Sequence, residues 1–153
     1  MKKILVSECL YGGRTVRYDG AEKACTHPVF LKWKKQGRLI PVCPEVFGGL
    51  PVPREEAQLR GDEVVTKSGQ DVTEQFIRGA EEALRIASEN DVVLCIMKEG
   101  SPSCGSTEVY DGTFEGKKIP GEGLTTGYLR ESGFEVFSEH EIEEAAEFLK
   151  ANE

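Results

Sequence analysis

Three short apolar runs, at residues 4–6, 39–42 and 92–97, have the length and composition of buried strands, and each leads into a loop that carries a cysteine. These cysteines are Cys9, Cys43 and Cys104. In an open parallel sheet, the loops that leave the carboxyl ends of the strands gather along one edge, where ligands bind. We therefore expect three thiols from distant parts of the chain to meet there. Two interpretations of them stay open: ligands of a metal or cluster with one coordination position left free, or small buried side chains.

Strand-like and helix-like patterns alternate along the chain, which is typical of an α/β fold. The longest helix is predicted to start at Asp71-Val72-Thr73-Glu74, which has the form of a capping box. Its apolar residues then recur every three or four positions to about Ala87. We expect a three-layer, Rossmann-like α/β sandwich with a mostly parallel sheet, formed by one domain over residues 1–153.

Shorter elements complete the predicted pattern. A short helix is expected after Thr26, a strand at residues 134–137, and a last helix capped by Ser138. Residues 98–123 hold six glycines and are predicted to form one long loop. Loops of that length in small domains are usually functional or disordered.

Composition narrows the function classes. The chain has 153 residues and a net charge of −8, so we expect no binding to long nucleic acid, which depends on basic surface. No apolar run approaches the roughly 20 residues that span a bilayer, so neither a membrane segment nor a signal peptide is predicted, and a cytoplasmic location is expected. The five cysteines are an odd number and contain no Cys-x-x-Cys pair, which argues against disulfides, zinc ribbons and ferredoxin-type cysteine runs.

Polar residues next to the three cysteines are candidates for chemistry. Glu45, two residues after Cys43, is placed to act as a general base on water, although a solvated loop carboxylate is the alternative interpretation. Ser101, three residues before Cys104, can relay a proton or hold a substrate oxygen, or can be an ordinary turn residue. Further candidates for the pocket lining, with surface or packing roles as the alternative, are Arg17, Tyr18 and Ser103.

The remaining thiols and the two histidines carry weaker signals. Cys95 lies in the middle of an apolar run and is predicted to be a buried hydrophobe. Cys25 precedes a short helix and is interpreted as a bystander. His27 is two residues from Cys25 with no evident orienting partner, so a cysteine–histidine hydrolase is weakly supported. His140 is expected to be solvated.

Several segments together resemble a bacterial and archaeal family, long known as a domain of unknown function, that includes the thiouracil desulfidases. They recur in order over nearly the whole chain, and two of them, Cys-Pro-Glu and Ser-Pro-Ser-Cys-Gly, are long enough to be specific. The matching segments are Cys9-Leu10, Val16-Arg17-Tyr18-Asp19-Gly20, Cys43-Pro44-Glu45-Val46-Phe47-Gly48-Gly49-Leu50-Pro51-Val52-Pro53-Arg54, Asp71-Val72-Thr73, Ser101-Pro102-Ser103-Cys104-Gly105 and Tyr110-Asp111-Gly112-Thr113-Phe114.

The resemblance implies the short, single-domain form of that family, with a [4Fe–4S] cluster held by Cys9, Cys43 and Cys104. The fourth iron has no protein ligand in this interpretation and binds the sulfur of a small thiolated pyrimidine. The implied catalytic pair is Glu45 and Ser101. The implied reaction is a non-redox desulfuration of 2-thiouracil, 4-thiouracil or 4-thiouridine monophosphate that releases sulfide. An exposed cluster can be lost in air, so aerobically prepared protein can lack it. The pattern predicts no particular oligomeric state.

Three other functions compete with this one. A hydro-lyase would use the same open iron to bind a hydroxyl and a carboxylate. A zinc-binding structural or sensor module would add Cys25 or His27 to the three loop cysteines. Persulfide handling would make Cys25 or Cys95 essential.

Overall fold

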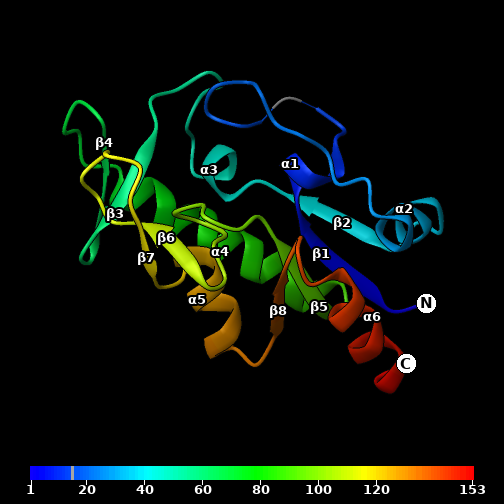
Figure 1. Cartoon of the computed structure of the whole chain (residues 1–153). Coiled ribbons are helices and arrows are strands. Elements are labelled where there is room, and N and C mark those ends of the chain that lie inside the picture. The colour runs from blue at the N-terminus through cyan, green and yellow to red at the C-terminus, as the bar shows by residue number, and fades with distance from the viewer. Residues whose placement is uncertain (15) are drawn as a thin grey trace.

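The computed structural model describes residues 1–14 and 16–153, and its main sheet consists of four parallel strands in the order β2-β1-β5-β8 (Figure 1). The strands of this sheet are β1 (Lys3–Ser7), β2 (Leu39–Val42), β5 (Val92–Met97) and β8 (Glu135–Ser138). Helices cover both faces, so the predicted three-layer α/β sandwich is confirmed. None of the helices described in these two ranges is long and apolar enough to cross a membrane.

The two faces of the sheet are covered by different helix pairs because successive strand residues point in opposite directions. Ile4 and Val6 of β1 are buried on one face, while Leu5 is buried on the other. The first face packs against α2 (Pro28–Lys35) and α6 (Ile142–Ala151). The second packs against α4 (Thr73–Glu89) and α5 (Leu124–Glu131). As predicted, Cys95 is fully buried within this core.

Short helices follow the first two strands at the carboxyl edge of the sheet. They are α1 (Glu8–Tyr11), directly after β1, and α3 (Pro44–Phe47), directly after β2. Cys9 lies in α1, and Cys43 is the N-cap residue of α3. The edge of the sheet is therefore where two of the three cysteines are placed.

Two antiparallel hairpins extend the molecule away from its termini (Figure 1). They consist of β3 (Ala57–Arg60) with β4 (Glu63–Thr66), and of β6 (Glu108–Tyr110) with β7 (Lys118–Pro120). The prediction of one long loop at residues 98–123 was wrong, because it contains the second hairpin. The buried Gln58 stabilises that hairpin by accepting the N–H groups of Gly112 and Phe114 at 3.0 and 3.3 Å.

Helix starts differ from the predictions at three places. At α2 the N-cap residue is His27 rather than Thr26, because Pro28 occupies the first turn and His27 Nδ1 accepts the N–H of Val29 at 3.1 Å. At α4 the capping box does not form: Val72 is the N-cap residue, and its side chain makes no capping hydrogen bond. At α6 the helix begins only at Ile142, and the Glu141 carboxylate accepts the N–H of Ser138 at 2.9 Å.

Candidate active site

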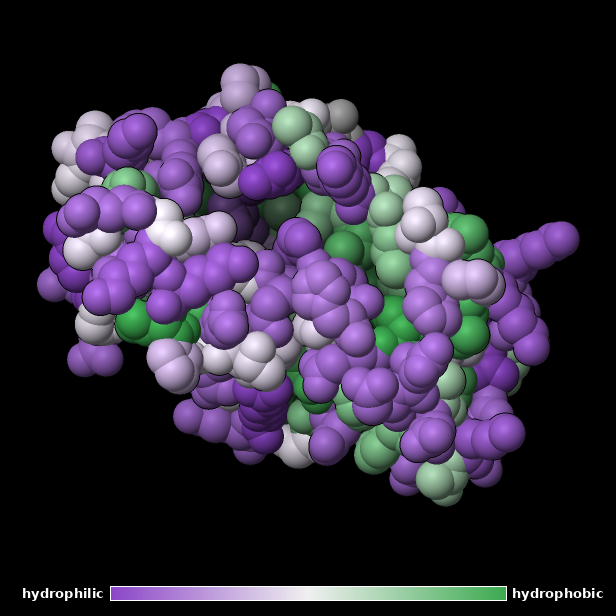
Figure 2. All heavy atoms as spheres, in the orientation of Figure 1, coloured by the Kyte–Doolittle hydropathy of each residue, from purple (hydrophilic) through white to green (hydrophobic). Residues whose placement is uncertain are grey.

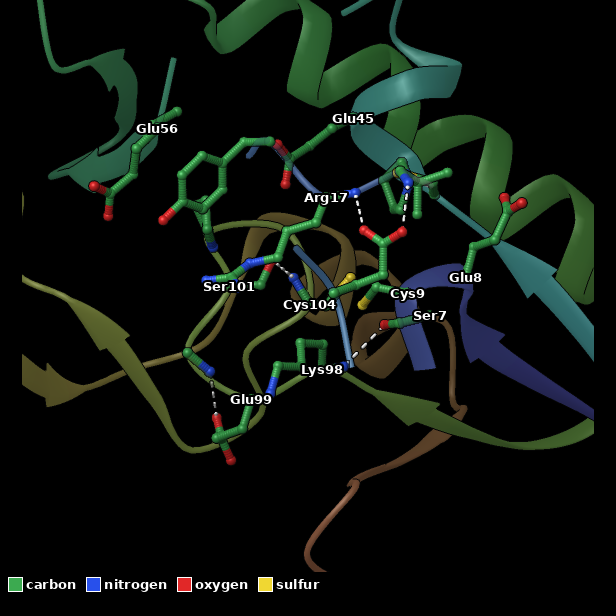
Figure 3. A pocket seen from close by; sticks show the side chains of 18 of the residues that line it. Ser7, Glu8, Cys9, Arg17, Glu45, Glu56, Lys98, Glu99, Ser101 and Cys104 are labelled. Atoms are coloured by element: carbon green, nitrogen blue, oxygen red, sulfur yellow. Dashed lines mark hydrogen bonds between the residues drawn. The ribbon is translucent and has the colours of Figure 1, made fainter. Parts of the chain in front are cut away.

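The three loop cysteines line one cavity of about 340 Å³ at the carboxyl edge of the sheet. Glu45 and Ser101 line the same cavity. Figure 3 shows the sulfur atoms of Cys9 and Cys104 close together, with Ser101 and Glu45 around the same space. On the molecular surface the cavity opens as a hollow with a largely hydrophilic rim (Figure 2). The structure thus brings together the five residues for which the sequence indicated chemistry.

All three thiols lie in surroundings that favour the neutral form. Burial raises the pKa of Cys9, Cys43 and Cys104, and it does so at Cys9 to about 12, with the charge of Cys43 adding to the shift. Charges at Cys9 and Cys43 also raise the pKa of Cys104. A thiol becomes a ligand as the thiolate, so a bound cationic metal or cluster is the partner that this set of donors fits.

Cys25 and His27, the alternative fourth ligands of a zinc site, lie outside the cavity. Among residues 1–14 and 16–153, no three His, Cys, Asp or Glu side chains are placed to hold a single metal ion. A multi-iron cluster has a different requirement, since each thiolate binds its own iron atom. Cys25 packs against the core on the α2 side, and the ring nitrogen Nδ1 of His27 is occupied by the N–H of Val29. Neither residue is part of the cavity lining.

The loop that carries Cys104 is fixed by hydrogen bonds on both sides. Ser101 Oγ accepts the N–H groups of Ser103 and Cys104, each at 3.1 Å. On the other side, the N–H of Thr125 donates to the Ser103 carbonyl, and the hydroxyl of Thr126 donates to the Cys104 carbonyl, both at 2.9 Å. The start of α5 therefore holds the backbone of this loop, and Ser101 retains its own hydroxyl hydrogen for donation.

Glu45 is held by a buried arginine. Its Oε1 accepts a hydrogen bond from Arg54 Nε at 3.0 Å, and Oε2 lies 3.4 Å from the hydroxyl of Ser103. Ser103 is itself buried, so this predicted lining residue contacts Glu45 rather than the open part of the cavity. The sequence singled out Glu45 but gave no indication that Arg54, nine residues later, would be its partner.

Arg17 and Tyr18 form one wall of the cavity. The guanidinium carbon of Arg17 lies 5.1 Å from the centre of the Tyr18 ring, a cation–π contact. Their segment is anchored by Glu22, whose carboxylate accepts the N–H groups of Val16 and Arg17 at 3.3 and 2.9 Å. The structure thus places both predicted lining residues at the cavity, on a segment with a fixed backbone.

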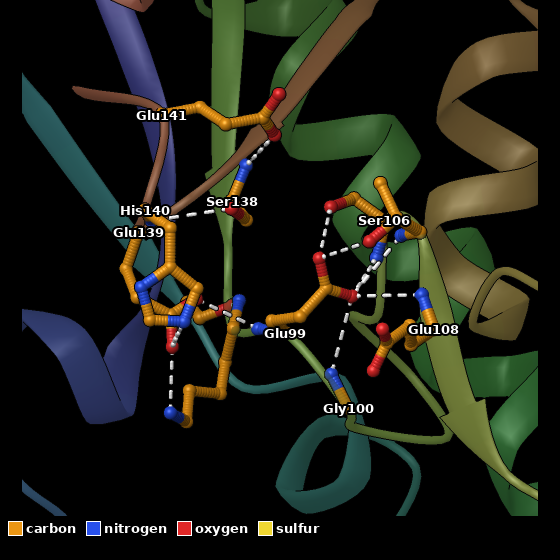
Figure 4. Close-up of polar contacts among 11 residues, drawn as sticks. Glu99, Gly100, Ser106, Glu108, Ser138, Glu139, His140 and Glu141 are labelled. Atoms are coloured by element: carbon orange, nitrogen blue, oxygen red, sulfur yellow. Dashed lines mark hydrogen bonds and ion pairs between the residues drawn. The ribbon is translucent and has the colours of Figure 1, made fainter. Parts of the chain in front are cut away.

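Glu99 holds the backbone at residues 106–108, and nothing in the sequence singled it out. Its carboxylate accepts backbone N–H groups of Ser106, Thr107 and Glu108 at 2.9 to 3.1 Å, and also both hydroxyls of the first two (Figure 4). The residues around Glu99 in the sequence do not predict this role, because a single glutamate in a glycine-rich stretch resembles any solvated carboxylate. The role arises from the fold, which points the three successive N–H groups of residues 106–108 toward the Glu99 carboxylate.

Comparisons with known proteins identify the family to which the chain belongs. The model of the 2-thiouracil desulfurase family matches residues 4–141. The uncharacterized protein YbbK of Bacillus subtilis (strain 168) is 42% identical over 149 residues, which cover 91% of this chain and 97% of that protein. A solved structure described as the [4Fe-4S]-dependent thiouracil desulfidase TudS is 47% identical, with a TM-score of 0.96 and 99% of each chain covered. The family predicted from the motifs is confirmed: the chain belongs to the 2-thiouracil desulfurase family.

Proposed function

We propose that this protein is a desulfidase that removes the sulfur of a thiolated uracil by hydrolysis, with a [4Fe–4S] cluster as its cofactor. The observation that carries the proposal is the cavity in which three thiols, a carboxylate and a hydroxyl from three separate segments meet. The similarity to a [4Fe-4S]-dependent thiouracil desulfidase over 99% of both chains supports the same activity. All five cysteines are free thiols, which suits a reducing, cytoplasmic environment.

Cys9, Cys43 and Cys104 would hold the cluster. When bound, the cluster supplies an iron atom that has no protein ligand, and such an iron can accept the substrate sulfur and polarise the carbon to which it is attached. The burial of Cys43 and Cys104 keeps bulk water from two of the three sulfur ligands. The rest of the chemistry falls to residues of the chain itself.

Glu45 is the proposed general base. Its Oε1 is occupied by Arg54, so Oε2 is the oxygen that takes a proton from the attacking water. Ser101 is the proposed hydrogen-bond donor to the substrate. Its Oγ already accepts two N–H groups, so the hydroxyl hydrogen is directed away from them and is available to the substrate or to a relayed proton.

The proposed substrates are 2-thiouracil, 4-thiouracil and 4-thiouridine monophosphate. The planar ring of any of these can lie against the wall formed by Tyr18, and Arg17 places a positive charge beside it. The cavity accommodates a small molecule, so a single thiolated pyrimidine rather than long nucleic acid is the proposed partner.

The test is anaerobic reconstitution with iron and sulfide, followed by metal analysis and a sulfide-release assay with each of the three substrates. We expect about four iron atoms per chain by the chemistry of the cluster, together with one sulfide released per uracil formed. Zinc in place of iron would overturn the cofactor. An iron-loaded protein that releases no sulfide, but removes water from a hydroxy acid, would identify a hydro-lyase instead.

A further inference from the structure

We propose that Arg54 is the positioning residue of this site: it orients the Glu45 carboxylate and ties it to the segment that forms the cavity wall. This inference rests on the proposed function, since it assigns a role in the desulfuration reaction. Arg54 does not need to touch the substrate for this role. It acts through Glu45, the residue that we propose as general base.

The guanidinium group of Arg54 is almost completely enclosed. Its side chain is 7% exposed, and that of Glu45 is 16% exposed. Each of its three nitrogen atoms has a different partner: Nε donates to Glu45 at 3.0 Å, Nη1 to the Pro51 carbonyl at 3.0 Å, and Nη2 to the Val16 carbonyl at 2.9 Å. The guanidinium group is planar and its donors point in fixed directions. The carbonyls of Pro51 and Val16 therefore determine where Nε holds the Glu45 oxygen.

This arrangement gives the two oxygen atoms of Glu45 different environments. Oε1 is fixed by the charged Nε of Arg54, while Oε2 faces the neutral hydroxyl of Ser103 at the longer distance of 3.4 Å. The stronger partner therefore determines the rotation of the carboxylate, and the weaker one leaves Oε2 able to exchange partners. A general base requires this, because the oxygen that accepts the proton must be held at a defined position and still be reachable by water.

The second connection of Arg54 runs to the cavity wall. Its backbone N–H donates to the Tyr18 carbonyl at 2.8 Å, in addition to the side-chain bond to Val16. Glu22 holds the same segment from its other side through the N–H groups of Val16 and Arg17. Replacement of the Arg54 side chain therefore removes one of several anchors of the wall, but it removes the only ion pair formed by Glu45 among the residues that the structure describes.

The bonds of Arg54 to Glu45 and to the cavity wall predict different effects on kcat and on KM. Loss of the side chain should reduce kcat about 100-fold, because a misdirected catalytic group has a cost of that order. The KM for the thiolated uracil should change by less than about threefold, because Tyr18 keeps its backbone anchor and Arg17 keeps its hydrogen bond to Glu22.

The experiment compares Arg54→Ala, Arg54→Lys and Arg130→Ala in reconstituted protein. Arg130 is a matched control, since it also pairs with a carboxylate, Glu122, and donates to the Ser106 carbonyl, but it does not line the cavity. We expect all three variants to show the visible absorbance of the loaded cluster. Only the two Arg54 variants should lose kcat, with Arg54→Lys retaining more activity because it keeps the charge but not the three-way fork.

Chemical rescue provides the decisive readout. Added guanidinium at millimolar concentration should restore part of the activity of Arg54→Ala, while sodium chloride at equal ionic strength should not, and Arg130→Ala should respond to neither. The inference is overturned if guanidinium gives no rescue, if KM rises as much as kcat falls, or if the Arg54 variants lose their cluster absorbance. If wild-type protein with a full cluster releases no sulfide from any of the three substrates, the proposed function fails, which is a separate result.

Discussion

A side-chain carbon on Gly79 would lie 1.8 Å from the carbonyl oxygen of Pro44. The contact is repeated one turn away, where a carbon on Gly48 would lie 1.9 Å from the Gln75 carbonyl oxygen. The backbones of α3 and α4 are therefore in direct contact at two points, one helical turn apart. Since α3 carries Glu45 and begins directly after Cys43, the long helix determines where two site residues lie.

Gly79→Ala should displace α3 and damage the site. An alanine inside a helix normally stabilises it, but here the methyl group overlaps a backbone atom that cannot move alone. We expect a loss of about 1–3 kcal/mol in the free energy of unfolding, measured by chemical denaturation, and a lower cluster absorbance after reconstitution.

Gly127→Ala is the control for this substitution. Gly127 is also helical, and its nearest neighbour would be the flexible end of the Glu122 side chain at 3.2 Å. That variant should be as stable as the wild type or slightly more stable, and fully loaded. Equal stability of the two alanine variants would show that α3 and α4 tolerate separation.

Glu45→Gln and Cys104→Ala should separate catalysis from cluster binding. The amide of Glu45→Gln cannot accept a proton from water, so we expect normal visible absorbance with sulfide release reduced at least about 100-fold. Cys104→Ala removes a proposed ligand and should lose both absorbance and activity. Full activity of the first variant would remove Glu45 from the mechanism, and a normally loaded second variant would remove Cys104 from the ligand set.

The sequence predicted the part of the site that depends on strand position. A cysteine after a buried parallel strand has only one edge of the sheet to occupy, so the apolar runs before Cys9, Cys43 and Cys104 were sufficient to predict their convergence. The alternation of buried residues along β1 and β5 then determined which helices cover which face.

The interactions that fix the site could not be predicted in the same way. The pairing of Arg54 with Glu45 depends on how a loop with several glycines and prolines returns toward α3, and no periodicity describes such a loop. From the sequence, Gly79 is expected only to lower the stability of its helix slightly. Its role in the structure is to allow the close contact with Pro44. The short hairpin of β6 and β7 also depends on contacts from outside it, because Gln58 accepts the N–H of Gly112 in its turn and Glu99 accepts the N–H of Glu108 at the start of β6.

Glu99 should make the stability of the protein depend on acid pH. Burial acts to raise its pKa, but hydrogen bonds from Thr107, Glu108 and Ser106 outweigh burial and lower the pKa from 4.5 to about 2. The folded state therefore binds the proton less readily than the unfolded state. The stabilisation is complete above about pH 4.5 and is lost as the pH falls from there toward 2.

The measurement compares the free energy of unfolding of the wild type and Glu99→Gln across that range. At pH 7 the variant should be less stable by about 2 kcal/mol, since it loses charged acceptors for several N–H groups. The difference should shrink as the pH falls below 4.5. Glu89→Gln, at an exposed carboxylate of α4 that pairs with Arg85, serves as the control and should cost much less stability at pH 7, because exposed ion pairs contribute little. A constant difference for Glu99→Gln at all pH values would contradict the assignment.

Two adjacent threonines at the start of α5 offer the sharpest test of how the Cys104 loop is held. Both are fully buried, but only Thr126 donates to the Cys104 carbonyl, at 2.9 Å. The hydroxyl of Thr125 has no hydrogen-bond partner within residues 1–14 and 16–153. Valine has nearly the same shape as threonine, so a valine substitution at either position removes the hydroxyl with little change in packing.

Thr126→Val should lower the free energy of unfolding by about 1–3 kcal/mol, because it leaves a buried carbonyl without its donor. It should also reduce cluster loading, because the carbonyl belongs to a proposed ligand. Thr125→Val should be neutral or stabilising, because it replaces an unsatisfied buried hydroxyl with a methyl group. Denaturation curves and cluster absorbance of the two variants, prepared side by side, check both expectations. If Thr126→Val is as stable and as well loaded as Thr125→Val, then α5 does not hold the Cys104 loop in place.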